Sequence, residues 1–561
     1  MRASVRPVFL AISLCLLVVA CTATGATDGS DQPSEDRGGL ESARVFESND
    51  PLARACALEP EWLVRIYRGY GQRSEDLTFV HQKPNFPGAF GLPSHSGPWD
   101  YLQTVPLVFY GPEYIRAHGA PLTRAASTID VYETVGWLED VDLPERGGGL
   151  LGEVLKPDAP ERPPKLVVTL VWDGVGRNVL DRWPDQWPAL KRMEREGTSY
   201  LNATVGSSPS ITPATHASLG TGSFPRVHGV PSINYRDRDG RVREAFQGRD
   251  PSLLELTTFA DEIDLAYGNA SRVGMLGFKS WHLPMMGHGL ATPGGDADQL
   301  TLIGGEEGRL SGNPNFYSTP PYMDGFPGLK RFAAQLDRSD GKADGKWLGN
   351  SPLAMHDNPA WVRYAERVLV TTLEREGYGS DEVPDLFFTN FKISDIVGHQ
   401  YTMDSPQMRE VIKAQDNALR NLVGYLDREV RDYVVILTAD HGHVPSAERT
   451  GAWPVGNGEL VSDLDRHFDM TTGESLVDQS TSTGLFLNFD AMRQLEITGN
   501  DIAMFLNGYT IRENWRESEL PRRYEERGDE QVFSAAFTRR QFPAIMRCAF
   551  GSDKPPAGVG G

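Results

Sequence analysis

Three short apolar runs in the middle of the chain each stop at an acidic residue or a polar turn. They are Leu166–Trp172, which ends at Asp173, Asp385–Phe391, which ends near Asp395, and Tyr433–Thr438, which ends at Asp440. Continuous apolar runs of this length are typical of strands that are buried on both faces. The pattern therefore predicts three core strands.

Between the second and third runs, the apolar spacing changes to that of a helix. Ser405 and Pro406 suit an N-cap and a first-turn proline. Apolar side chains then recur with helical spacing at Met408, Val411, Ile412, Leu419, Leu422, Val423 and Leu426. The order of strand, helix and strand predicts an α/β fold with a parallel sheet. Polar residues just past the carboxyl ends of such strands converge on the ligand crevice, where we expect Asp173, Asp395 and Asp440.

Composition limits the classes of function. The chain has 561 residues, 55 Lys and Arg against 76 Asp and Glu, and a net charge of −21. This balance argues against binding to a nucleic-acid polymer, which needs clustered Lys and Arg. An apolar content of 39% with 58 Gly and 39 Pro is typical of a loop-rich globular protein.

The first residues predict an export signal. Arg2 and Arg6 precede an apolar run over 8–19 that is too short to span a bilayer, and the run ends in Val-Val-Ala-Cys at Cys21. This end resembles a bacterial lipobox, so we expect a lipid on Cys21. The alternative is an ordinary secretory signal with a chance cysteine. We therefore expect an extracytoplasmic, lipid-anchored bacterial membrane protein, at the cell surface or in the periplasm.

Two cysteines remain for the mature chain. Cys15 lies in the signal and Cys21 is the expected lipid site, which leaves Cys56 and Cys548. Two thiols in an oxidising compartment are more often bonded than free. We therefore predict a disulfide between them, the alternative being two buried thiols.

Candidate metal ligands gather at the predicted strand ends. His399 follows Asp395 by four residues, His441 follows Asp440 directly, and His443 lies two further on. Carboxylate oxygen and imidazole nitrogen are good Zn²⁺ ligands, and residues four apart can face one centre on a helix. Three such places, each behind an apolar run, predict a metal site.

A candidate nucleophile lies between these places, in the segment SSPSITPATHASLGTG. Thr212 precedes a proline and suits the N-cap of a helix. A hydroxyl there lies at the positive end of the helix, which favours an alkoxide and a bound phosphate. The alternative is a capping threonine without chemistry, and Ser208, Ser210 and Thr215 are competing hydroxyls.

Four motifs in this order, VTLVWDG, SPSITPATHASLGTGSFPRVHGV, SDIVGH and TADHGH, resemble the alkaline phosphatase superfamily. The resemblance is to its branch of type I phosphodiesterases, nucleotide pyrophosphatases and threonine-nucleophile phosphatases, over residues 165 to 445. It implies an alkaline phosphatase-like α/β fold, a largely parallel central sheet flanked by helices with an inserted cap region.

The resemblance also implies two divalent metal ions, usually Zn²⁺. By motif position, the metal that activates the nucleophile would be held by Asp173, Thr212, Asp440 and His441. The second metal would be held by Asp395 and His399. His216 and His228 match positions that support the ligands.

The family pattern needs one more histidine on the second metal, usually near the C-terminus, and this chain departs from it. After His443 the only histidine is His467. Upstream, GLPSHSGPWDYLQTVPLVFYGPEYI resembles the family's closing segment and offers His95. We therefore predict a circular permutation, with His95 as the missing ligand. The alternative keeps the usual order and uses His443 or His467, with His95 in a surface loop.

The predicted organisation has seven parts. They are a lipoprotein signal peptide with a lipobox (1–21), a flexible tether (22–50), the permuted C-terminal segment of the catalytic fold (51–156), a linker (157–165), the first part of the catalytic core (166–234), a cap insertion (235–383) and the second part of the core (384–561).

The resemblance implies hydrolysis of small phosphate esters through a phospho-threonine. In LGFKSWHLPMMGHG, Lys279 fits a phosphate-binding lysine of the monoesterases, but Trp281 stands where an arginine is expected. Loss of a bidentate guanidinium weakens recognition of a dianion, which favours a phosphodiester or pyrophosphate bond. Asn234 is a further candidate for the phosphoryl oxygens, or a turn residue. An alkaline phosphatase-type monoesterase and a non-catalytic phosphate-binding lipoprotein are the alternatives, and the oligomeric state stays open.

Overall fold

The computed structural model describes residues 47–89, 92–305, 308–354, 356–470 and 473–556. The predicted signal peptide and the tether up to residue 46 lie outside the described residues. In the described ranges, no helix combines the length and the apolar character that a membrane crossing requires.

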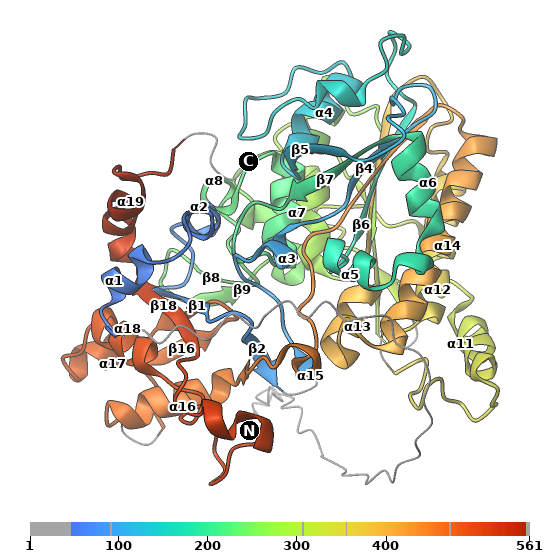
Figure 1. The fold of residues 1–561 in the computed structure, drawn as a ribbon. Coiled ribbons are helices and arrows are strands. Elements are labelled where there is room, and N and C mark those ends of the chain that lie inside the picture. Colours follow the sequence, from blue (N-terminus) through green and yellow to red (C-terminus); the bar gives the residue numbers. More distant parts are fainter. Residues whose placement is uncertain (1–46, 90–91, 306–307, 355, 471–472, 557–561) are drawn as a thin grey trace, which may run out of the picture. The chain divides into compact units, whose positions relative to one another are not determined.

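A nine-stranded sheet forms the centre of the fold (Figure 1). Its strands, in spatial order, are β12 (Arg309–Ser311), β11 (Gln299–Gly304), β10 (Val273–Gly277), β13 (Asp385–Phe391), β6 (Leu166–Trp172), β14 (Tyr433–Thr438), β4 (Leu107–Tyr110), β7 (Thr198–Thr204) and β5 (Leu122–Ser127). Among these strands, β4 and β12 run opposite to the others. The largely parallel sheet that the sequence predicts is confirmed.

The three predicted core strands, β6, β13 and β14, have the predicted bounds and lie side by side. Leu166 of β6 is level with Asp385 of β13 and with Tyr433 of β14, and all three strands run in parallel. Because the strands start level and have similar lengths, their carboxyl ends meet at one edge of the sheet. This register brings the residues that follow each strand together.

Helices cover both faces of the sheet (Figure 1). One face carries α6 (Pro188–Glu196), α12 (Pro359–Glu376) and α14 (Pro406–Glu429), and the other carries α4 (Asp130–Leu138), α7 (Thr212–Thr221) and α9 (Phe259–Ala266). Alternate residues of β6 serve the two cores, since Val168 and Leu170 pack on the first face and Val167 and Val171 on the second. As predicted, α14 begins after Ser405, whose hydroxyl accepts the Met408 N–H.

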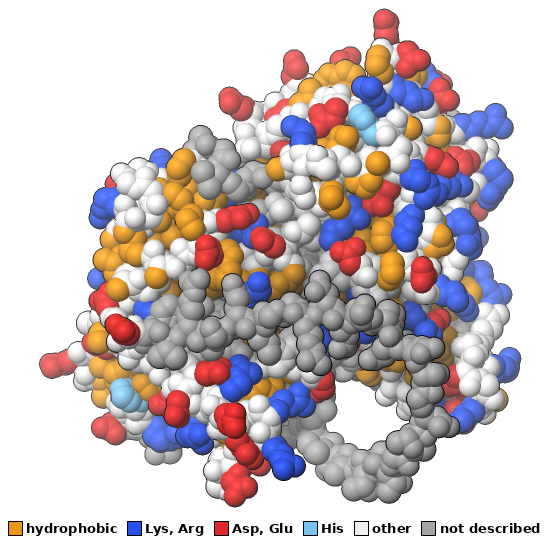
Figure 2. Space-filling view, viewed as in Figure 1, with side chains coloured by type: hydrophobic (Ala, Val, Ile, Leu, Met, Phe, Trp, Pro, Cys, Tyr) orange, Lys and Arg blue, Asp and Glu red, His pale blue; other side chains and the backbone are white. Residues whose placement is uncertain are grey.

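Charged side chains of both signs share the surface. Figure 2 shows Lys and Arg most often over α6, α12 and α14, with Asp and Glu distributed among them and elsewhere. The surface is therefore not uniformly acidic, although the net charge is −21.

The segment 51–156 belongs to the body of the fold. It supplies β4 and β5 to the central sheet, and β4 lies between β14 and β7. It also supplies β1 (Leu77–His81) to a second, four-stranded sheet with β16 (Val477–Ser480), β17 (Gly484–Leu487) and β18 (Phe533–Thr538). The segment thus contributes strands to both sheets, and its partners there come from the middle and from the C-terminal part of the chain.

The predicted cap over 235–383 requires correction. Three of its strands, β10, β11 and β12, lie in the central sheet, and β10 pairs directly with β13. The sequence prediction missed them because the segment between β10 and β11 is irregular and gives no strand–helix–strand pattern. These three strands of the range therefore extend the sheet instead of covering the site.

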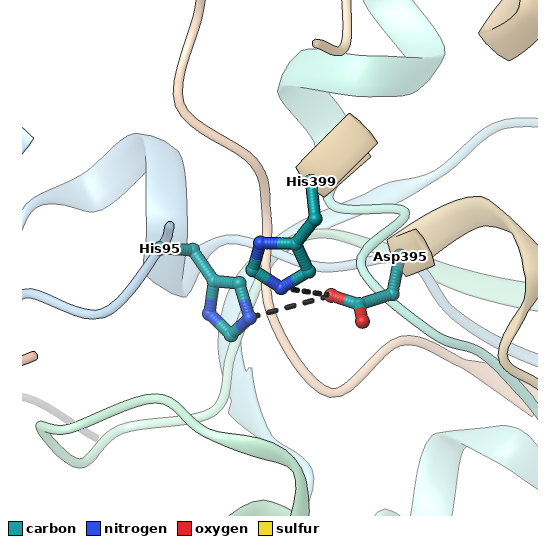
Figure 3. A group of neighbouring side chains, drawn as sticks. All are labelled: His95, Asp395 and His399. Atoms are coloured by element: carbon teal, nitrogen blue, oxygen red, sulfur yellow. Dashed lines mark ion pairs between the residues drawn. The ribbon is translucent and has the colours of Figure 1, made fainter. Parts of the chain in front are cut away.

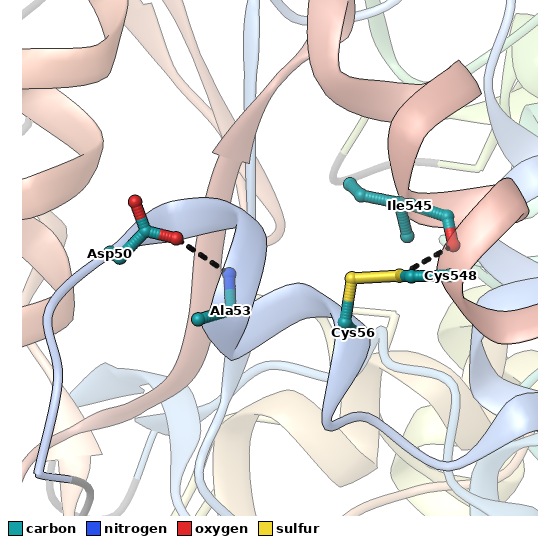
Figure 4. Close-up of a disulfide and its surroundings, with 5 residues drawn as sticks. All are labelled: Asp50, Ala53, Cys56, Ile545 and Cys548. Atoms are coloured by element: carbon teal, nitrogen blue, oxygen red, sulfur yellow. Dashed lines mark hydrogen bonds between the residues drawn. A yellow bond between two sulfur atoms is a disulfide. The ribbon is translucent and has the colours of Figure 1, made fainter.

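A disulfide joins Cys56 to Cys548, as predicted (Figure 4). Cys56 ends α1 (Pro51–Cys56) and Cys548 lies in α19 (Phe542–Phe550), with the two Cα atoms 6.0 Å apart. Apolar residues of α1, α19 and α2 (Pro60–Gly69) pack together around this link. The bond therefore holds the two ends of the described chain side by side.

Candidate metal and nucleophile site

Side chains from the ends of the three core strands form one buried cluster. Asp173 follows β6, Asp395 lies in α13 (Ile393–Tyr401) just after β13, and Asp440 follows β14 by two residues. All three carboxylates are at most 4% exposed. The sequence prediction that they converge is confirmed by their common contacts with His441, whose Nε2 lies 3.6, 3.8 and 3.4 Å from oxygens of Asp173, Asp395 and Asp440.

One half of the cluster contains His95, Asp395 and His399 (Figure 3). Nε2 of His95 lies 3.3 Å from Asp395 Oδ1, and Nε2 of His399 lies 3.4 Å from the same oxygen. The alternative chain order requires His95 to lie in a surface loop. His95 is only 4% exposed, which argues against that alternative. A histidine about 300 residues upstream of its partners thus lies where the permutation hypothesis expects it.

Backbone carbonyls orient the imidazoles of this cluster. Nδ1 lies 3.2 Å from the Ser210 carbonyl in His95, 2.8 Å from the Pro93 carbonyl in His399 and 3.0 Å from the Gly442 carbonyl in His441. Because a carbonyl only accepts, each Nδ1 carries the hydrogen and each Nε2 keeps a lone pair in the neutral ring. Such second hydrogen bonds are typical of histidines that ligate a metal.

His443 reaches the same carboxylate from another side. Its Nε2 lies 3.3 Å from Asp395 Oδ1, and it is fully buried. A Cβ at Gly398 would lie 2.3 Å from this nitrogen and one at Gly174 would lie 2.8 Å from the ring, so both glycines leave room for the imidazole. His443 therefore stays a candidate ligand beside His95, whereas His467 lies in α16 (Asn457–His467) and packs on Phe468 and Phe505.

The other half of the cluster contains Asp173, Asp440, His441 and Thr212. The backbone N–H of Gly174 donates to Asp440 Oδ1 at 2.9 Å, which ties the ends of β6 and β14 together. Thr212 is 2% exposed and is the first residue of α7. The helix begins one residue earlier than predicted, with Ile211 instead of Thr212 at its N-cap, a difference that is usual at helix ends.

Lys392 connects the two halves. Its Nζ donates to Asp173 Oδ1 and Thr212 Oγ1, both at 3.0 Å, and lies 2.7 Å from Asp395 Oδ2. The side chain is buried, and it directly follows β13. Thr212 is thus joined to the aspartates through one ammonium group, whereas the hydroxyl of the competing Thr215 donates to carbonyls of its own helix turn.

The charges act on one another strongly. Burial by itself raises the pKa of Asp173 and Asp395, but the Lys392 ammonium reverses the shift and both pKa values lie below the ordinary range. Burial and the neighbouring Asp173 carboxylate raise the pKa of Asp440 to about 7. Burial lowers the pKa of His441 to about 3, which keeps its ring neutral.

The donor set fits divalent metal ions. Within the described residues, several buried polar atoms of the cluster have no hydrogen-bond partner: Asp395 Oδ1, Asp440 Oδ2, His441 Nε2, His443 Nε2 and His282 Nε2. Neutral imidazole nitrogens and carboxylate oxygens around a common centre are the ligands that Zn²⁺ prefers, although other divalent ions accept them too. The orphaned atoms would gain ligand bonds from such ions.

Two further residues support the ligands. His216 donates from Nδ1 to the Thr212 carbonyl at 2.8 Å, and its Nε2 accepts the amide of Asn390 at 2.9 Å. Asn390 also donates to Asp173 Oδ2 at 2.9 Å. His216 is thus used within the protein, and His228 pairs with the Ser218 hydroxyl at 3.1 Å. Both positions agree with the supporting roles that the resemblance implies.

The predicted substrate residues lie in neighbouring elements. Asn234 starts β8 (Asn234–Arg236) and pairs with Glu244 of β9 (Val242–Glu244), whose carboxylate accepts the Trp281 indole at 3.1 Å. Lys279 is exposed, with Nζ 5.7 Å from the Trp281 ring centre. These contacts join Asn234 and Lys279 through Trp281, and their roles toward a substrate stay predictions.

Sequence reasoning missed Lys392, Asn390 and His282 as members of the site. His282 lies with Nε2 3.5 Å from Asp173 Oδ2 and is fully buried. For Lys392 and Asn390 a signal existed, because both lie at the carboxyl end of a predicted strand. A lysine in an otherwise apolar stretch before SDIVGH was the observation that could have identified it.

Comparisons with known proteins place the chain among phosphate-ester hydrolases. The family model of type I phosphodiesterase / nucleotide pyrophosphatase matches residues 167–483, more than half of the chain. Alkaline phosphatase PafA of Elizabethkingia meningoseptica is 24% identical over 57% of this chain and 67% of its own length. Alkaline phosphatase PhoV of Synechococcus elongatus is 23% identical over 50% of this chain and 60% of its own length.

The fold is also similar to a solved structure. The crystal structure of alkaline phosphatase PafA matches with a TM-score of 0.52 and 19% identity, over 68% of this chain and 85% of that chain. At this identity the likeness concerns the fold alone.

Proposed function

We propose a reaction for this chain, which belongs to the type I phosphodiesterase / nucleotide pyrophosphatase family and is a phosphate-ester hydrolase. The chain cleaves phosphodiester or pyrophosphate bonds of small substrates, with Thr212 as the nucleophile. The observation that carries the proposal is the position of Thr212 Oγ1, which shares Lys392 with Asp173 next to the histidine cluster. Family membership favours an enzyme over a non-catalytic binding protein.

The protein's own groups suit this reaction. Thr212 Oγ1 attacks phosphorus, the bond to the leaving oxygen breaks, and the hydroxyl proton passes through water to the leaving group. A water molecule then hydrolyses the phospho-threonine and restores the hydroxyl. The first turn of α7 directs backbone N–H groups and the positive end of the helix toward phosphoryl oxygens. Lys392 holds the hydroxyl oxygen in place, and positioning with positive charge is most of what phosphoryl transfer requires of a protein.

The proposal also includes two divalent metal ions, which we expect to be zinc. Asp173, Asp440, His441 and Thr212 would hold one, and His95, Asp395 and His399 would hold the other. Bound there, such ions stabilise negative charge on the attacking and leaving oxygens.

A diester or pyrophosphate is favoured because Trp281 replaces the expected arginine near Lys279. The similarity to alkaline phosphatases PafA and PhoV favours monoester hydrolysis as a second candidate. Hydrolysis of bis(p-nitrophenyl) phosphate and p-nitrophenyl phosphate should be compared, with and without a chelator. We expect a faster diester reaction that the chelator stops. A monoester preference of about a hundredfold or more would contradict the choice of substrate.

The permuted chain order is also proposed. It is supported by the position of His95 at Asp395, by β4 in the central sheet and by the disulfide between the two ends. The linker over 157–165 is part of that proposal and precedes β6 directly.

We further propose export and lipid anchoring through Cys21, which the disulfide supports because such bonds persist in oxidising compartments. Cys21→Ser should move the protein from the membrane fraction to the soluble fraction. An unchanged membrane fraction would argue against the lipobox.

A further inference from the structure

The ammonium of Lys392 lies where the two proposed metal positions meet. Its three donors have three acceptors, on the segment after β6, at the start of α7 and in α13: Asp173 Oδ1, Thr212 Oγ1 and Asp395 Oδ2, at 3.0, 3.0 and 2.7 Å. An ammonium has three hydrogens and no acceptor, so this set uses it fully. The group is 4% exposed, and solvent does not compete for it.

The two halves of the site stand in different relations to this cation. On the nucleophile side, Lys392 holds the same two oxygens, Asp173 Oδ1 and Thr212 Oγ1, that a metal ion would use. On the histidine side it does not, because Asp395 divides its oxygens. Oδ2 faces Lys392, whereas Oδ1 faces the Nε2 atoms of His95 and His399.

Like charges repel, and the repulsion is strong in a buried site. A dication on the nucleophile side must share two oxygens with a buried ammonium. One on the histidine side also meets a carboxylate that Lys392 contacts, but through Oδ1, while Lys392 contacts Oδ2. The same ammonium fixes the Thr212 oxygen and still leaves the hydroxyl a second lone pair. Lys392 thus supplies positive charge at the nucleophile without a metal.

We propose that Lys392 is a positioning residue that holds Thr212 and takes over part of the charge of the nucleophile-side ion. The protein then retains one divalent ion firmly, at His95, Asp395 and His399, and a second one only at higher metal concentration. This inference rests on the proposed metal-dependent function.

Zinc uptake by the folded protein tests the inference directly. The wild type, Lys392→Met and Lys413→Met are dialysed against buffers of fixed free zinc, and zinc per chain is measured by mass spectrometry. Lys413→Met is the matched control, because it removes an exposed lysine of α14 away from the cluster. We expect two steps for the wild type and the control, separated by about a hundredfold or more in free zinc, and for Lys392→Met a second step shifted to at least about tenfold lower zinc.

The outcomes separate this inference from the proposed function. If the wild type binds two ions at the same free zinc concentration, the inference is wrong, whether or not Lys392→Met folds. It is also wrong if a folded Lys392→Met takes up zinc as the wild type does. If the wild type binds no zinc and shows no metal-dependent turnover, the proposed function itself is wrong.

Discussion

The protein has two clusters of three aspartates at opposite edges of its sheet. Asp173, Asp395 and Asp440 lie at the carboxyl ends of strands, whereas Asp298 directly precedes β11 and lies near Asp264 of α9 and Asp296. In the second cluster the candidate ligand oxygens lie within 4.8 Å of one another, and Asp264 and Asp298 are 4% and 8% exposed. The clusters thus have the same residue type, and they differ in burial at one position, because Asp296 is exposed.

The pKa shifts differ in direction for two of the three aspartates, because the pKa of Asp440 in the first cluster is raised to about 7, as that of Asp264 is in the second. In the first cluster, Lys392 holds the pKa of Asp173 and Asp395 below the ordinary range. In the second, burial and the neighbouring carboxylates raise the pKa of Asp264 to about 7 and the pKa of Asp298 well above its ordinary range. The comparison teaches that acidic residues alone do not make a site. A cation and neutral imidazoles, placed by the strand ends, distinguish the first cluster.

The largest expected effect is at Thr212. If the first cluster is catalytic, Thr212→Ala should lower kcat by at least about a thousandfold, because the attacking oxygen is gone. Thr212→Ser keeps a hydroxyl and should retain part of the activity, while both variants should bind zinc. Full activity of Thr212→Ala would remove the nucleophile from the proposal.

Next in size is the loss of His95. His95→Ala should lower zinc by about one ion per chain, since it removes one of the three ligands on the histidine side, and turnover should fall by about a hundredfold or more. His467→Ala is the control, because this histidine packs on Phe468 and Phe505. If His95→Ala is silent while His443→Ala abolishes activity, the usual chain order is the better account.

A smaller effect, on the free energy of unfolding, is expected at the second cluster. Asp264 has a folded pKa of about 7, above that of the unfolded chain, so it lowers stability as pH rises from about 4 through 7. Asp264→Asn should therefore raise the free energy of unfolding by about 1 kcal/mol at pH 8 in the presence of a chelator and change it little at pH 4. A loss of stability at pH 8 would show that the charged carboxylate has a partner.

The smallest effect concerns Asp296 of the same cluster. Its side chain is exposed, and water screens its charge. Asp296→Asn should change the free energy of unfolding by only a few tenths of a kcal/mol at pH 8, as denaturant titration can measure. A gain as large as that of Asp264→Asn would mean that repulsion, rather than burial, dominates this cluster.

Much of the first cluster could be predicted from the sequence because its residues follow apolar runs directly. Asp173, Asp395 and Asp440 were placed by the ends of β6, β13 and β14, whose bounds the pattern predicts correctly. His95 needed the resemblance, since no local pattern connects it to residues 300 positions away. The positions of the three aspartates thus followed from the predicted ends of the strands.

Lys392, His282 and the second cluster could not be predicted in the same way. The position of Lys392 at the end of a predicted strand was a signal for the site, but only the register of β6 against β13 shows that it contacts Asp173 and Thr212. Asp264 and Asp298 meet because α9 packs near the start of β11, a tertiary arrangement without a local signal. The second sheet was missed for the same reason, because β1 and β18 are more than 450 residues apart.

The bond between Cys56 and Cys548 turns most of this protein into a covalent ring, because 492 positions separate the two cysteines. A protease that cuts one exposed loop inside the ring opens it but releases no fragment, and the pieces part only when a reductant is added. A nicked molecule would therefore keep the His95 segment attached to the rest of the site.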